Sequence, residues 1–116
     1  MAVSRNSGYW FVGHTITVQL TAYASVPQHT DSTPWITASG SRPRFGTLAH
    51  NGLPFGTVVR LPEVFGNQTF TVEDRMNERY GDEYADVWLP TDAEAHAFRV
   101  RRDTPMVIVA LPHPEP

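Results

Sequence analysis

Two aspartates, Asp74 and Asp86, are each expected in or at the end of a short strand, and their residue type can do acid/base chemistry. An aspartate side chain has an ordinary pKa of about 3.9. It therefore holds a proton near neutral pH only if burial or a neighbouring negative charge raises that pKa. A pair of aspartates could supply such an acid. The same spacing also fits aspartates that end their strands and pair with Arg75 or Arg79.

The sequence contains no recognised motif for binding a metal or for forming a covalent intermediate. The chain has no cysteine, which excludes disulfides, thiolate metal sites and a cysteine nucleophile. Its five histidines lack the close spacing of metal-binding motifs such as His-Glu-x-x-His. Neither an EF-hand loop nor a Gly-x-Ser-x-Gly turn occurs. We therefore expect no metal and no cofactor.

Short strands should position the polar side chains, because ten prolines and eight glycines divide the 116 residues into short segments. Apolar and polar residues alternate over 14–24, which predicts a half-buried strand. Further strands are expected at 46–49, 57–61, 68–74, 85–89 and 105–111. A capping box at 91–94 begins the one expected helix, which should run to about residue 99.

The length allows one compact core and is too short for two ordinary domains. We predict a single domain at 14–111, with an N-terminal extension at 1–13 and a C-terminal tail at 112–116. The stretch 25–44 is rich in Pro, Ser, Thr and Gly. It is expected to form a long surface loop that makes one wall of a cleft.

Charge and hydropathy limit the kinds of binding partner that the protein is expected to have. Twelve acidic residues against nine basic ones give a net charge of -3, and no basic run is long enough to follow a phosphate backbone. We therefore expect no nucleic-acid partner. The apolar segment 9–12 is far shorter than the roughly 20 residues that cross a bilayer, so no transmembrane segment is expected. The protein is expected to act as a monomer.

Six short segments follow one another in a characteristic order. They are Leu20-Thr21-Ala22-Tyr23, Ile36-Thr37-Ala38-Ser39-Gly40, Gly46-Thr47-Leu48-Ala49, Leu53-Pro54-Phe55-Gly56-Thr57, Val72-Glu73-Asp74 and Ala85-Asp86-Val87-Trp88-Leu89. In this order they resemble the 3D domain, a family named after three aspartates. The resemblance covers roughly residues 16–110 and extends to the catalytic barrel of membrane-bound lytic transglycosylase A and to stationary-phase survival proteins. It implies a mainly β fold, a six-stranded double-psi β-barrel with one short helix.

The resemblance also implies a function, that of a lytic transglycosylase that cuts the glycan strands of peptidoglycan and leaves a 1,6-anhydro sugar. The family's second and third aspartates fall on Asp74 and Asp86, and Asp86 takes the place of the acid/base. The residues expected to bind the glycan are Tyr23, Thr37, Ser39, His50, Asn51 and Arg75. An extracytoplasmic site of action, in the periplasm or the cell wall, follows, with a targeting segment that this chain does not contain.

One departure from the family leaves other functions open. The place of the first family aspartate holds His50-Asn51. This favours a non-catalytic module that binds cell-wall glycan on the same barrel, as in expansin-like proteins. The presence of Asp74 and Asp86 favours the enzyme. A third possibility is a partner-binding domain without any affinity for carbohydrate.

Overall fold

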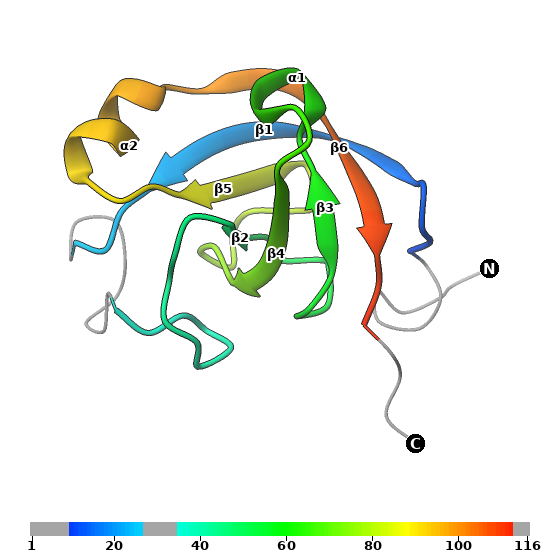
Figure 1. The fold of residues 1–116 in the computed structure, drawn as a ribbon, viewed down its shortest axis with the longest axis horizontal. Coiled ribbons are helices and arrows are strands. Elements are labelled where there is room, and N and C mark those ends of the chain that lie inside the picture. The colour runs from blue at the N-terminus through cyan, green and yellow to red at the C-terminus, as the bar shows by residue number, and fades with distance from the viewer. Residues whose placement is uncertain (1–9, 27–34, 113–116) are drawn as a thin grey trace.

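Six strands close into a barrel in the computed structural model, which describes residues 10–26 and 35–112 (Figure 1). The elements are β1 (Thr15–Tyr23), β2 (Thr47–Ala49), β3 (Val58–Arg60), α1 (Pro62–Phe65), β4 (Thr69–Asp74), β5 (Tyr84–Trp88), α2 (Asp92–Phe98) and β6 (Arg101–Ala110). The predicted mainly β fold with six strands is confirmed. Most of the expected N-terminal extension, the middle of the expected loop and the end of the tail (1–9, 27–34 and 113–116) lie outside the described residues.

The strand order around the barrel is β1-β5-β2-β4-β3-β6, and β6 returns to β1. Two of the pairings are parallel, β1 with β5 and β2 with β4. The other four are antiparallel. Parallel neighbours need a crossover connection instead of a tight hairpin. In this order β2 lies between β4 and β5, two strands that come later in the chain.

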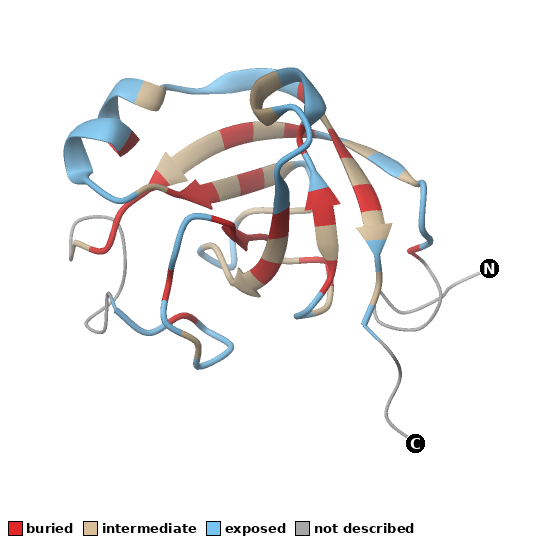
Figure 2. Ribbon diagram, viewed as in Figure 1, coloured by how far each residue is buried: buried red, intermediate tan, exposed pale blue. Residues whose placement is uncertain are grey.

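Alternating burial separates the barrel interior from its outer face (Figure 2). Val18 and Leu20 of β1 are fully buried, whereas the residues between and beside them are only partly buried or exposed. The interior core consists of Trp10, Val18, Leu20, Leu48, Leu53, Val59, Leu61, Phe70, Val72, Ala85, Val87, Met106 and Ile108. Side chains of the opposite parity point away from this core, and Tyr23, Ala49 and Trp88 form a second, smaller cluster there.

The expectation of a single helix is wrong, because the described residues contain two. α2 begins where the capping box predicts, with the Thr91 hydroxyl accepting a hydrogen bond from the Glu94 amide at 3.1 Å. α1 is a single turn with Pro62 at its start and Gly66 after its end. Proline and glycine at those two places are ordinary start and stop signals. Four residues are too few for hydrophobic periodicity to reveal a helix.

β6 also begins earlier than expected, at Arg101 and not at Pro105. The apolar, β-branched run Met106-Val107-Ile108-Val109 predicts only the second half of this strand, because the residues before it are polar. Pro105 instead lies inside β6, opposite Thr17 of β1. In the described part of the chain, neither helix is long and apolar enough to cross a membrane.

Candidate functional site

β2 lies between the two strands that carry the aspartates. Ala49 of β2 is in register with Asp86 on the antiparallel strand β5 and with Asp74 on the parallel strand β4. Residues in register on neighbouring strands project from the same face of a sheet. Two strand spacings separate the aspartate backbones by roughly 10 Å. The two carboxyl groups therefore flank Ala49 on one face.

A register shift brings Asp74 to this face. Leu48 pairs with Val72, so a regular ladder would set Ala49 opposite Glu73. The ladder shifts between Leu48 and Ala49, and Asp74 takes the place opposite Ala49. An extra residue of this kind in one strand is a β-bulge, which re-aims the side chains around it.

The face that carries the carboxyl groups has its own small apolar cluster, separate from the barrel interior. Tyr23, Ala49 and Trp88 are buried in it, and Met76 packs against them. The indole Nε1 of Trp88 donates a hydrogen bond to the Ser25 hydroxyl at 2.8 Å. Trp88 is therefore a packing residue, and the cluster packs on the same face as the two aspartates.

Asp86 is held by its register partner on β1. The Thr21 hydroxyl donates a hydrogen bond to Oδ1 of Asp86 at 3.0 Å. Loss of water around the carboxyl raises the pKa of Asp86 to about 7, although the hydrogen bond from Thr21 lowers it and the charge of Asp74 raises it. Asp86 thus carries its proton in a large fraction of molecules near neutral pH, as a general acid requires.

Asp74 has a different environment, with three hydrogen-bond donors. The Tyr23 hydroxyl donates to Oδ2 at 2.7 Å, and the backbone amides of Ala38 and Arg75 each donate to Oδ1 at 2.9 Å. Burial and then the nearby carboxylate of Asp74 raise the pKa of Tyr23, so its hydroxyl keeps its proton and remains a donor. These contacts fix the orientation of Asp74 and solvate its negative charge.

The segment 35–44 lies against the end of β4. The amide of Ser39 donates to the Glu73 carbonyl at 3.1 Å, next to the contact between Ala38 and Asp74. The Thr37 hydroxyl lies 3.1 Å from the Ser39 hydroxyl and 2.7 Å from that of Ser41. Thr37 is buried and Ser39 is exposed. The predicted loop therefore places a group of hydroxyls beside Asp74, of which Ser39 faces solvent.

His50 is buried, and its ring bonds to the backbone. The amides of Gly52 and Leu53 donate to Nδ1 at 3.1 and 3.0 Å, so Nε2 carries the proton and donates to the Asp82 carbonyl at 2.9 Å. A Cβ on Gly52 would lie 2.0 Å from Oδ1 of Asp82, so any larger residue there would have to displace the Asp82 side chain. His50 thus joins two loops, and its ring is not presented to a ligand. Its predicted role in glycan binding remains a prediction that this geometry does not favour.

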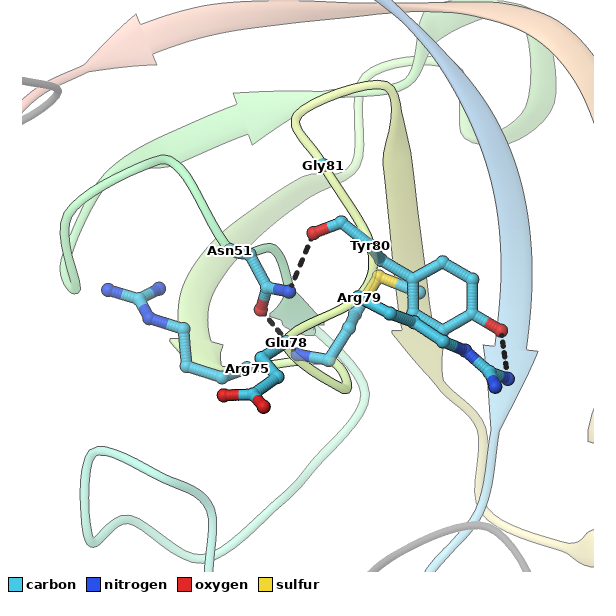
Figure 3. Close-up of a pocket in the computed structure, with 7 residues that line it drawn as sticks. Asn51, Arg75, Glu78, Arg79, Tyr80 and Gly81 are labelled. Atoms are coloured by element: carbon cyan, nitrogen blue, oxygen red, sulfur yellow. Dashed lines mark hydrogen bonds between the residues drawn. The ribbon is translucent and has the colours of Figure 1, made fainter.

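Asn51 fastens the loop between β4 and β5 to the end of β2 (Figure 3). Its Nδ2 donates to the carbonyls of Asn77 and Tyr80 at 2.8 and 2.9 Å, and its Oδ1 accepts from the Met76 amide at 2.8 Å. All three partners are backbone groups of one loop. The Asn51 side chain is therefore a structural anchor, and it needs an amide because it donates twice and accepts once.

A pocket of about 470 Å³ opens over this loop. It is lined by Asn51, Arg75, Met76, Glu78, Arg79, Tyr80 and Gly81 (Figure 3). Nη1 of Arg75 donates to the His50 carbonyl at 2.7 Å, and the guanidinium lies 3.8 Å from the centre of the Phe55 ring. Neither aspartate lines the pocket. Met76 links the pocket to the aspartate face, because it lines the pocket and also packs against the cluster of Tyr23, Ala49 and Trp88.

The structure thus groups the residues that the sequence singled out. Those beside the carboxyl pair are Tyr23, Thr37, Ser39, Asp74 and Asp86, those at the pocket are Asn51 and Arg75, and His50 is buried between loops. Sequence reasoning missed Thr21, although it lies two residues before Tyr23 and so on the same face of β1. It also missed the Ala38 amide, which no side-chain pattern can reveal.

No protein-family model matches the chain, and no curated protein matches it. Within residues 10–26 and 35–112, no three His, Asp or Glu side chains gather in a way that could hold a metal ion. The function is therefore inferred from the residues and their geometry.

The raised pKa of Asp86 predicts a pH-dependent stability. The folded state binds the Asp86 proton more tightly than the unfolded state, whose ordinary value is 3.8. This contribution is complete below about pH 4 and is lost as the pH rises through about 7. At pH 9 we expect the free energy of unfolding of Asp86→Asn to exceed that of the wild type by about 2 kcal/mol, a figure that allows for partial solvent access to the carboxyl. At pH 4 the two free energies of unfolding should be nearly equal. Urea unfolding at both pH values measures this.

The matched control is Asp103→Asn. Exposed Asp103 accepts a hydrogen bond from the Gln19 side chain, and an asparagine keeps that acceptor. The control should therefore show the same pH dependence as the wild type. Equal stability of Asp86→Asn and wild type at pH 9 would mean that Asp86 is not desolvated.

The anchoring role of Asn51 predicts that the isosteric change Asn51→Asp destabilises the fold. An aspartate cannot donate to the carbonyls of Asn77 and Tyr80, and its charge would face both. We expect a loss of about 2 kcal/mol at pH 7, measured by urea unfolding. Asn77→Asp is the control, because the Asn77 side chain only accepts, from the Arg79 amide at 3.0 Å. Similar losses in the two variants would contradict the anchor.

Proposed function

We propose that this chain is a peptidoglycan lytic transglycosylase-like enzyme of the 3D type, with Asp86 as its general acid/base. It cleaves the bond between N-acetylmuramic acid and N-acetylglucosamine and leaves 1,6-anhydro-N-acetylmuramic acid. The observation that carries the proposal is the pairing on one barrel face of a carboxyl whose pKa is about 7 with a second carboxyl held by three donors. Burial favours the protonated form of Asp86, and the three donors fix the orientation of the Asp74 carboxyl.

The reaction needs one proton donor and no water. Asp86 gives its proton to the glycosidic oxygen while the bond from that oxygen to C1 of the muramic acid breaks. The C6 hydroxyl of the same sugar forms the new bond to C1, and its proton passes to Asp86. The carboxyl ends protonated as it began, so a single residue serves as acid and then as base.

Asp74 assists without transferring a proton. Its charge raises the pKa of Asp86. It also faces the positive charge that develops at C1 as the glycosidic bond breaks. The fixed donors from Tyr23, Ala38 and Arg75 hold that charge in place, so it need not reorient during the reaction.

The finer form of the barrel belongs to the same proposal. Six strands closed into a ring, with parallel pairs β1/β5 and β2/β4, are compatible with a double-psi β-barrel. We further assign the protein to the periplasm or cell wall, where it acts on glycan strands as a monomer. Exposed Ser39, beside Asp74, is the best placed of the predicted hydroxyls to contact the sugar.

A second candidate function is a non-catalytic module that binds wall glycan. The observation in its favour concerns Asn51, which together with His50 occupies the place of the family's first aspartate. Its amide bonds to Met76, Asn77 and Tyr80, so this position supplies no third carboxyl to the site. Such a module would hold the glycan on the same face without cutting it.

Product analysis tests the function directly. Purified peptidoglycan is incubated with the wild type, Asp86→Asn and Asp103→Asn, and the released muropeptides are analysed by mass spectrometry. We expect 1,6-anhydro products from the wild type and Asp103→Asn, and a loss of at least 100-fold in Asp86→Asn, the usual scale of general acid/base catalysis.

Each other result has a distinct meaning. Reducing-end products that depend on Asp86 would indicate hydrolysis in place of transglycosylation. If no variant releases product while all of them sediment with the peptidoglycan, the binding module replaces the enzyme.

The pH dependence of the rate gives an independent test. A general acid acts only when protonated, so kcat/KM should fall about tenfold per pH unit above the pKa of Asp86, about 7. The profile is measured with soluble glycan strands between pH 5 and 9. A rate that rises through this range would require the ionised form of the residue and would exclude Asp86 as the initial proton donor.

A further inference from the structure

The charged side chains that line the pocket of Figure 3 suit a ligand with one negative charge. Arg75 and Arg79 contribute two guanidinium groups and Glu78 one carboxylate, which leaves one net positive charge among the lining side chains. Figure 3 shows the two arginine side chains reaching to opposite sides of Asn51. A monoanion would balance the pocket, whereas Glu78 would repel a dianion.

Arg75 is fixed in position before any ligand arrives. The His50 carbonyl accepts one of its five N–H groups, and the ring of Phe55 stacks on the guanidinium. Burial lowers the pKa of Arg75, and the charge of Asp74 partly offsets this. A guanidinium that has lost water but remains charged gains more from an anion than a fully hydrated one does.

Arg79 and Tyr80 supply the other side of the pocket. Nη2 of Arg79 donates to the Tyr80 hydroxyl at 2.9 Å, and the guanidinium lies 4.9 Å from the centre of the Tyr80 ring. The hydroxyl accepts in this contact, so its own proton can be donated. Planar guanidinium forks match the two oxygens of a carboxylate.

The loop that carries these residues is fastened at both ends. Asn51 holds the backbone of Met76, Asn77 and Tyr80, and the Arg75 amide bonds to the carboxylate of Asp74. The pocket therefore adjoins the carboxyl pair through Arg75 and Met76. A polymer bound beside Asp74 has the pocket within its reach.

From this arrangement we infer that the pocket binds the carboxylate of the peptide attached to muramic acid. The inference rests on the proposed function for the identity of the polymer, and it adds a peptide subsite to the glycan site. Wall glycan that carries its peptide then binds more tightly than glycan stripped of it.

The test uses two probes that differ in one charge, N-acetylmuramyl-alanine with a free carboxylate and the same compound as its amide. Binding is followed by NMR titration of the backbone amides of residues 75–81. We expect the acid to bind about tenfold more tightly than the amide and to shift these amides. Arg79→Gln, at an exposed position, should reduce the advantage of the acid to about twofold or less.

The matched control is Arg102→Gln, which removes an exposed arginine of β6 that does not line the pocket. It should keep the tenfold advantage. Equal binding of acid and amide by the wild type would overturn the inference, as would an equal loss in both arginine variants. Stronger competition by inorganic phosphate than by acetate would also overturn it, because it would indicate a phosphate site.

These experiments distinguish failure of the peptide subsite from failure of the proposed enzymatic function. Asp86-dependent 1,6-anhydro products together with equal binding of acid and amide would remove the peptide subsite alone. Binding of the acid through Arg79 without any cleavage of peptidoglycan would remove the enzymatic function and leave a peptide-carboxylate site.

Discussion

The double pairing of β2 is the constraint on which the candidate site depends. This strand has only three residues, yet it is bonded to β4 on one side and to β5 on the other. Ala49 at its end sets the positions of Asp74 and Asp86 at once, because it is in register with both. A methyl group is small enough to lie between two carboxyl groups and Tyr23. A shift of one residue in either ladder would turn one carboxyl to the other face of the sheet.

The two aspartates acquire different chemistry from their surroundings alone. Asp86 has one donor, Thr21, and little water, so its neutral form is favoured near pH 7. Asp74 has three donors, so its charge is well solvated by the protein. Tyr23 is buried beside Asp74 and stays a donor, because loss of water and then the charge of Asp74 raise its pKa. One residue type thus provides an acid and a fixed anion on the same face.

The sequence predicts those features that depend on local pattern. The alternation in β1, the capping box at Thr91 and the placement of Asp74 and Asp86 at strands are all visible in it. The shift at Ala49 is not, because it arises from pairing between strands that are distant in the chain. Local pattern also says nothing of the burial of His50, which two loops create together.

Asn51 shows how one side chain can couple two neighbouring sites. A carboxylate there would add a second negative charge near Asp74, but it could not hold the carbonyls of Asn77 and Tyr80. The amide removes that charge and fixes the loop 75–81. That loop supplies the Arg75 amide to Asp74 and the Arg75 guanidinium to the pocket. The anion beside the acid and the cations of the pocket are thus positioned by the same backbone, so a peptide carboxylate bound in the pocket would hold the sugar next to Asp74.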